Sequence, residues 1–184
     1  MNRTQNCRVL LVGESNPYGP SPEFALYCDP PGCSGHRLRL ILGLPEDDYL
    51  SLHRKNLCDG AWSMKSAQTR AFALLNPQAP WQVIVLLGRK VTQTFEKLAL
   101  EGVPLVAFST RRCCPGMDLV SLPHPSGRNA SLWLPSAQDR ARQILQKLAP
   151  EVPWGTVLTE ERPLAGEKFD IPTKQPIRAF QGKR

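Results

Sequence analysis

The sequence contains neither GxxxxGKS nor GxGxxG, the glycine-rich patterns with which many nucleotide enzymes bind phosphate. This absence argues against an enzyme that acts on a small-molecule nucleotide. The sequence also has no apolar run long enough to span a bilayer, and no amino-terminal stretch with the form of a secretory signal. We therefore expect a cytoplasmic protein that makes no use of a membrane.

The six cysteines include no CxxC pair and show no paired metal-ligand spacing. In a cytoplasmic protein their thiols are expected to be reduced. A zinc site built from Cys28, Cys33, His36 and Cys58 is the weaker alternative. We predict that the protein binds no metal and needs no other cofactor.

Positive charge exceeds negative charge, with 23 Lys and Arg against 16 Asp and Glu and a net charge of +7. The basic residues are scattered rather than gathered in a run, which favours a basic face over a basic tail. Such a face suits a polyanion, because neutralising phosphates releases their counterions. Solubility alone is the other explanation of the charge.

At 184 residues the chain has the length of one domain with a well-formed core. Strand-like and helix-like patterns alternate along it, which is typical of a parallel sheet covered by helices on both faces. Strands are predicted at 7–13, 49–60, 81–88, 105–110 and 117–122, with a loop at 111–116. Helices are predicted at 34–42, 63–75, 89–102 and 130–149.

The character of the sequence changes near residue 150. The segment 151–184 is rich in proline, has no sustained periodicity and ends in basic residues. We predict a domain at 1–150, followed by an extended proline-rich, basic tail at 151–184 with one short strand at 156–158.

The segment SLPHPSGRNASLW at 121–133 places His124 between two prolines. Each proline fixes φ and removes a backbone donor, while Gly127 permits a turn, so the imidazole is held on a short, stiff loop. A strand pattern precedes this loop and a helical pattern follows it. His124 is therefore expected at the carboxyl end of a strand, where open α/β sheets bind their ligands.

HPSGRN at 124–129 resembles the second active-site motif of the uracil-DNA glycosylase superfamily. RVLLVGESNPYG at 8–19 is similar to the first motif, an apolar strand that runs into a polar, proline-containing loop. The resemblance covers about residues 8–148. It implies a three-layer α/β/α domain with a mostly parallel, four-stranded sheet. The implied activity is hydrolysis of the N-glycosidic bond of an altered base in DNA, with uracil as the first candidate.

The resemblance also implies roles within the first motif. Asn16 matches the residue that positions water, and Tyr18 matches the side chain that closes the pocket at the 5-position of a pyrimidine. The motif has one residue more than usual between Gly13 and Pro17, and some members use a glutamate directly after the glycine. Glu14 is therefore the alternative to Asn16. We favour Asn16, because the following proline holds its backbone extended, and assign Glu14 a supporting role.

The remaining implied roles concern the leaving base. His124 would stabilise the anion that departs. Tyr27 is the first candidate to stack on the base, whereas Phe24 is expected to pack in the core. Asn56 would read the base, because its amide carries both a donor and an acceptor.

Contacts with DNA are expected from the HPSGRN loop and from cations that follow strands. Arg128 takes the place of the wedge residue that fills the gap left by the extruded base. The residues predicted to contact DNA are Ser126, Gly127, Arg128, Asn129, Arg89, Lys90, Arg111 and Arg112.

The expected partner is thus DNA that contains uracil or another altered base, bound by a monomer. The protein would lie at the nucleoid in a bacterium or in the nucleus of a eukaryote. The alternative is a DNA-binding module that keeps this fold but has weak or no catalytic activity, and that recognises modified or single-stranded DNA. The unusual spacing around Asn16 favours this alternative.

Overall fold

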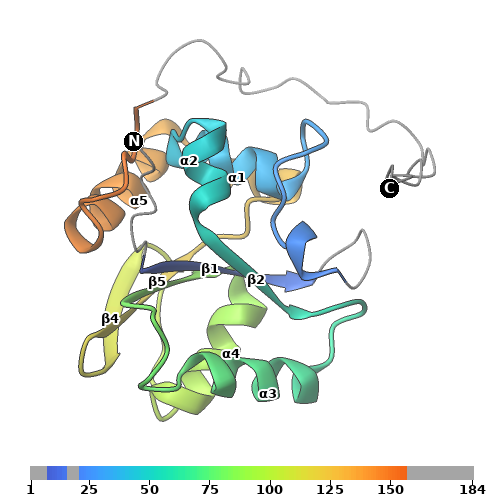
Figure 1. Cartoon of the computed structure of the whole chain (residues 1–184), viewed down its shortest axis with the longest axis vertical. Coiled ribbons are helices and arrows are strands. Elements are labelled where there is room, and N and C mark those ends of the chain that lie inside the picture. Colours follow the sequence, from blue (N-terminus) through green and yellow to red (C-terminus); the bar gives the residue numbers. More distant parts are fainter. Residues whose placement is uncertain (1–7, 16–20, 157–184) are drawn as a thin grey trace, which may run out of the picture.

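A five-stranded, mostly parallel mixed sheet flanked by helices forms the centre of the α/β fold (Figure 1). The computed structural model describes residues 8–15 and 21–156. The strands are β1 (Val9–Ser15), β2 (His53–Cys58), β3 (Val83–Leu87), β4 (Ser109–Cys114) and β5 (Met117–Leu122). Their order in the sheet is β2-β1-β3-β5-β4, with β4 antiparallel to β5 and the others parallel.

The sheet has one strand more than the four that the resemblance implied. The additional strand is β4, at the edge, and its position also corrects two sequence predictions. Most of the predicted loop at 111–116 belongs to β4, whereas most of the predicted strand at 105–110 precedes it in an irregular segment. Pairing with β5 holds β4 in place. This tertiary contact leaves no signal in a segment as polar and charged as Ser109–Cys114.

A third correction concerns the predicted strand at 49–60. Its first part belongs to helix α2 (Glu46–Ser51), and β2 begins only at His53. The first turn of α2 carries three acidic residues, which stabilise a helix amino terminus. Tyr49 is fully buried, and its hydroxyl donates to the carbonyl oxygen of Leu26 at 2.7 Å. This contact joins α2 to the chain segment that follows β1.

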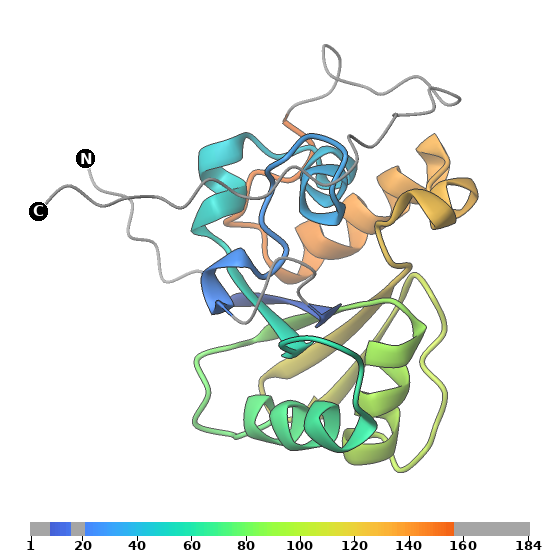
Figure 2. The same ribbon diagram turned by 90° about the vertical axis from the view of Figure 1, so that its right-hand side faces the viewer.

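Helices cover both faces of the sheet (Figures 1 and 2). One face packs against α2, α1 (Ser34–Leu42) and α5 (Pro135–Leu148), and the other against α3 (Met64–Leu74) and α4 (Arg89–Ala99). Strand β1 contributes to both interfaces, because successive side chains of a strand point to opposite faces. Val9 and Leu11 join the first core, whereas Leu10 and Val12 join the second. Within residues 8–15 and 21–156, no helix is long and apolar enough to cross a membrane.

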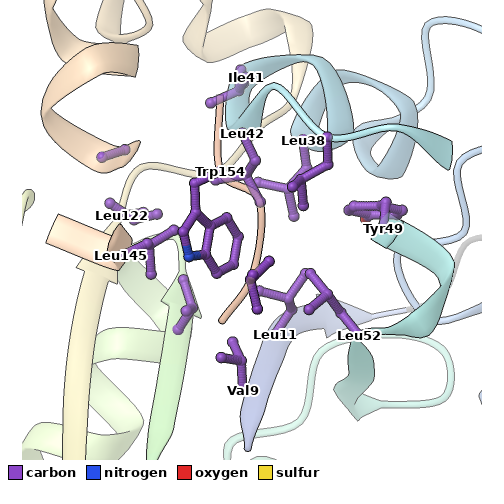
Figure 3. Close-up of a cluster of buried hydrophobic side chains, with 14 of the residues drawn as sticks. Val9, Leu11, Leu38, Ile41, Leu42, Tyr49, Leu52, Leu122, Leu145 and Trp154 are labelled. Atoms are coloured by element: carbon purple, nitrogen blue, oxygen red, sulfur yellow. The ribbon is translucent and has the colours of Figure 1, made fainter. Parts of the chain in front are cut away.

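The packing continues past residue 150. Trp154 is buried in the core on the side of α1 and α5 (Figure 3), and its indole Nε1 donates to the carbonyl oxygen of Ala149 at 2.8 Å. The amide nitrogen of Gly155 donates to the carbonyl oxygen of Leu42 at 3.0 Å, at the end of α1. Residues 151–156 thus pack on the domain. Residues 157–184, which include most of the strand predicted at 156–158, lie outside the described residues.

Replacing Trp154 by alanine tests how much this segment contributes to stability. We expect the free energy of unfolding to fall by about 3–5 kcal/mol, because the change removes a buried ring and its hydrogen bond. Denaturant unfolding measures the difference. Phe72→Ala is the control, since Phe72 is 71% exposed and its loss should change stability by about 0.5 kcal/mol or less. Equal effects of the two changes would contradict a structural role for Trp154.

Candidate functional site

The carboxyl ends of the parallel strands meet at one edge of the sheet. Strand β1 has β2 on one side and β3 on the other, so the order of the strands reverses between β1 and β3. Open α/β sheets bind ligands in the crevice at such a switch point. Glu14 lies at the end of β1, Lys90 lies in the first turn after β3, and His124 follows β5. The fold therefore brings these three predicted site residues to one edge.

The loop that carries His124 is anchored through its backbone. The carbonyl oxygen of His124 accepts hydrogen bonds from Asn129 Nδ2 at 3.1 Å and from the indole Nε1 of Trp133 at 3.3 Å. The Trp133 ring is buried and lies edge-on to Phe108, with 5.5 Å between the ring centroids. These contacts keep the short loop between β5 and α5 in one conformation.

The His124 ring has a defined protonation state. Its Nδ1 accepts a hydrogen bond from the backbone N–H of Ser126 at 3.1 Å, so the proton of the neutral ring resides on Nε2. Burial lowers the pKa of His124 below its ordinary value; nearby Glu14 opposes this shift, and Lys90 adds to it. Within residues 8–15 and 21–156, no group hydrogen-bonds to Nε2. The ring is thus a neutral donor near pH 7.

Gly88 lies between His124 and Glu14. Its φ is 97°, a conformation that favours glycine. A Cβ at this position would stand 3.0 Å from the Cβ of His124 and 3.3 Å from Oε1 of Glu14. Only a residue without a side chain allows these two groups to approach so closely. On the other side of the carboxylate, Oε2 of Glu14 pairs with the ammonium of Lys90 at 3.2 Å.

The side chain of Asn56 extends over β1. Asn56 pairs in register with Gly13, and a Cβ on Gly13 would lie 2.3 Å from Oδ1 of Asn56. This Oδ1 atom is buried and has no hydrogen-bond partner among the described residues. Buried amide oxygens are almost always paired. The unpaired oxygen is therefore a candidate acceptor for a ligand or for an ordered water.

Phe24 does not pack in the core, contrary to the sequence prediction. Its side chain is 40% exposed, and its ring lies edge-on to the half-buried Tyr27 with 6.1 Å between the centroids. Phe24 ends the short helix η1 (Pro22–Phe24), which contacts β2, the strand that carries Asn56. The helix that carries Phe24 thus lies beside this strand. Asn16 and Tyr18 lie outside the described residues.

Cationic side chains lie in the His124 loop, beside it and in the first turn of α4. Arg128 is exposed in the short helix η2 (Gly127–Leu132), and Arg89 is exposed in the first turn of α4. The sequence interpretation missed Arg37 of α1. Its guanidinium nitrogen Nη2 would lie 3.3 Å from a Cβ on Gly127. No sequence signal links Arg37 to a loop 90 residues later, because only the packing of the domain joins them.

Arg111 and Arg112 lie far from this site. They belong to β4 rather than to a loop, and they pair with Leu119 and Asp118 in the first half of β5. At about 3.3 Å per residue, the register position of Arg111 is roughly 10 Å short of the end of β5 at Leu122, after which the His124 loop begins. Arg112 forms an ion pair with Asp118 at 2.9 Å. We therefore leave both arginines out of the candidate site.

A hollow of about 340 Å³ opens at the opposite, amino-terminal edge of the sheet. Arg8, Trp81 and Met117 contribute to its lining, and none of the predicted site residues does. Because the polar and titratable groups described above gather at the carboxyl edge, we place the candidate site there rather than in this hollow.

The alternative zinc site does not form. Across residues 8–15 and 21–156, no group of three or more His, Cys, Asp or Glu side chains could hold a metal ion. Cys33 caps α1 instead, with its Sγ accepting from the backbone N–H of His36 at 3.3 Å. Cys58 contacts the backbone of Ser63.

The chain matches no protein-family model, and no curated protein has significant sequence similarity to it. The functional proposal therefore depends on the chemistry and arrangement of the site residues themselves.

The described geometry predicts the tautomer of His124. At pH 7 its ring should be neutral with the proton on Nε2, and its pKa should lie below the ordinary value of about 6.5. Nitrogen-15 NMR of the imidazole, followed through a pH titration, measures both properties. A His124 ring that carries its proton on Nδ1, or that titrates above the ordinary value, would contradict this description.

Proposed function

We propose that this protein is a DNA glycosylase of the uracil-DNA glycosylase type, with the three-layer α/β/α domain of that superfamily. One observation carries the proposal: His124 is a neutral Nε2–H donor at the carboxyl edge of the sheet, beside the carboxylate of Glu14. Strand β1 of the first motif and the loop of the second motif, which follows β5, both reach this edge, with β3 between the two strands. The helices on both faces of the sheet agree with the proposed architecture.

The substrate base is inaccessible inside a duplex, so it must first be flipped out at a cost of a few kcal/mol. Arg128, exposed next to the His124 loop, fills the gap that the base leaves. Arg89 lies at the same edge of the sheet and contacts the phosphates, as do Ser126, Gly127 and Asn129 of the loop. Basic residues at this edge give DNA affinity that does not depend on sequence.

The flipped base is bound between an aromatic ring and an amide. Stacking on Tyr27, or on Phe24, contributes about 1–3 kcal/mol. The exposure of Phe24 supports it as a second stacking candidate. The unpaired Oδ1 of Asn56 accepts from the base, and its amide nitrogen donates. An amide that does both can distinguish uracil from bases whose donors and acceptors are exchanged.

Cleavage of the N-glycosidic bond leaves positive charge on the sugar and negative charge on the departing base. The Nε2–H of His124 donates to O2 of that base and stabilises the anion. A fixed donor of this kind is worth about 3–4 kcal/mol in the transition state. A water positioned by Asn16, with Glu14 in support, then forms a bond to the anomeric carbon of the sugar. The proton that this water loses passes through solvent to the departed base anion, which leaves an abasic site and the neutral base.

The second candidate function is a binding module of the same fold with little catalysis. The ion pair between Glu14 and Lys90 favours it, because one oxygen of the carboxylate is already engaged. Oligonucleotides that carry uracil, hypoxanthine, xanthine or hydroxymethyluracil separate the two functions. A glycosylase leaves abasic sites in at least one of them, whereas a binding module retains the oligonucleotide intact.

Replacing His124 by alanine should slow single-turnover excision by about 100-fold or more and leave DNA affinity nearly unchanged. The reason is that the donor acts on charge that develops only as the bond breaks. Rapid-quench kinetics and equilibrium binding measure the two effects. His53→Ala is the matched control, because His53 is exposed at the start of β2. Normal excision by His124→Ala would remove His124 from the mechanism.

A separate comparison assigns the water-positioning residue. We expect Asn16→Ala to reduce excision more than Glu14→Gln does. A proline restricts the backbone of the residue before it to extended conformations, which limits the directions that the Asn16 side chain can take. Single-turnover rates of the two variants on the same substrate give the answer. If Glu14→Gln abolishes excision and Asn16→Ala retains it, Glu14 positions the water.

A further inference from the structure

The ammonium of Lys90 is held from two sides. It pairs with Oε2 of Glu14 at 3.2 Å, and it lies over the ring of Trp62 with 5.6 Å to the centroid. Trp62 follows β2, Glu14 ends β1, and Lys90 begins α4. The lysine thus connects three elements that meet at the carboxyl edge of the sheet.

The ion pair has a geometric rather than a stabilising consequence. The side chain of Lys90 is 55% exposed and that of Glu14 is 24% exposed. Ion pairs this close to solvent contribute little to folding stability. They still restrict the orientation of the less exposed partner, which here is the carboxylate. With Oε2 directed at Lys90, Oε1 is left beside Gly88, next to His124.

We propose that Lys90 is a positioning residue that orients the carboxylate of Glu14 beside His124. This role replaces the phosphate contact expected from the sequence. The effect of Lys90 on excision rests on the proposed glycosylase activity. The arrangement of Lys90, Glu14 and Trp62 does not depend on that activity. Trp62 contributes by holding the ammonium toward Glu14, as aromatic rings do for nearby cations.

The arrangement has a measurable effect on His124. The charged groups nearest its ring are Glu14 on β1 and Lys90 on α4, while Arg37 of α1 and Arg128 belong to the surroundings of the same loop. Lys90 lowers the pKa of His124 and Glu14 raises it. Lys90→Met should therefore raise the pKa of His124, and Glu14→Gln should lower it further, each by about 0.5 units for a charge several ångströms away.

The decisive measurement is a double-mutant cycle on the pKa of His124, followed by NMR in the full chain without DNA. If Lys90 fixes Glu14 beside His124, Glu14→Gln should lower this pKa less in the Lys90→Met background than in the wild type. Additive shifts would mean that Lys90 acts on His124 only through space, and would overturn the proposal. Thermal unfolding of each variant confirms that the comparison is between folded proteins.

Excision kinetics provide the second readout. Lys90→Met should slow single-turnover excision about 10-fold or more at saturating protein, and Lys90→Arg, which keeps the cation, should restore most of the rate. Lys97→Met is the matched control, because Lys97 lies in the last turn of the same helix. It removes one positive charge from the helix without changing the partner of Glu14, so it should leave the rate unchanged.

The two proposals fail in different ways. Weaker DNA binding by Lys90→Met at a normal excision rate would make Lys90 a phosphate contact. If the wild type excises none of the four bases, the glycosylase proposal fails. The cycle on the pKa of His124 would still establish or exclude the positioning of Glu14.

Discussion

Burial of the central strands on both faces is the constraint on which the rest of this structure depends. Strand β1 has no exposed face, so its apolar side chains must alternate between two separate cores. The backbone of such a strand is satisfied by neighbouring strands on both sides, and the neighbours here are the parallel strands β2 and β3. Because the connections between parallel strands pass through helices, the same constraint places helices on each face and brings four strand ends to one edge.

That edge is where polar groups can converge. Two glycines make the convergence possible, because neither has a side chain to occupy the space. Gly13 leaves room for the amide of Asn56, and Gly88 leaves room for His124 and Glu14. Rigid backbone anchors then fix the His124 loop through Asn129 and Trp133. Packing and hydrogen bonds thus preorganise the candidate site.

Burial also determines what His124 can do. A charged imidazole would be an acid with a proton to lose, whereas a neutral ring whose Nδ1 is already bonded is a donor at Nε2 alone. Burial and the charge of Lys90 both lower the pKa of His124 and so favour the neutral form, whereas the charge of Glu14 raises this pKa. Burial and the charge of Lys90 therefore both maintain the donor form of His124.

The sequence by itself determined the α/β class, the strands β1, β3 and β5, and the stiff loop of His124, because hydrophobic period, proline and glycine act locally. It also indicated Glu14, Asn56 and His124 as site residues. Only the tertiary structure decided the rest. Strand β4 depends on pairing with β5, and the exposure of Phe24 and the burial of Trp154 depend on which elements pack against them. Other contacts likewise join residues that are remote in the chain, since Arg37 approaches Gly127 and Lys90 pairs with Glu14. The pairing of β4 with β5 also places Arg111 and Arg112 away from the site. No local pattern encodes contacts of this kind.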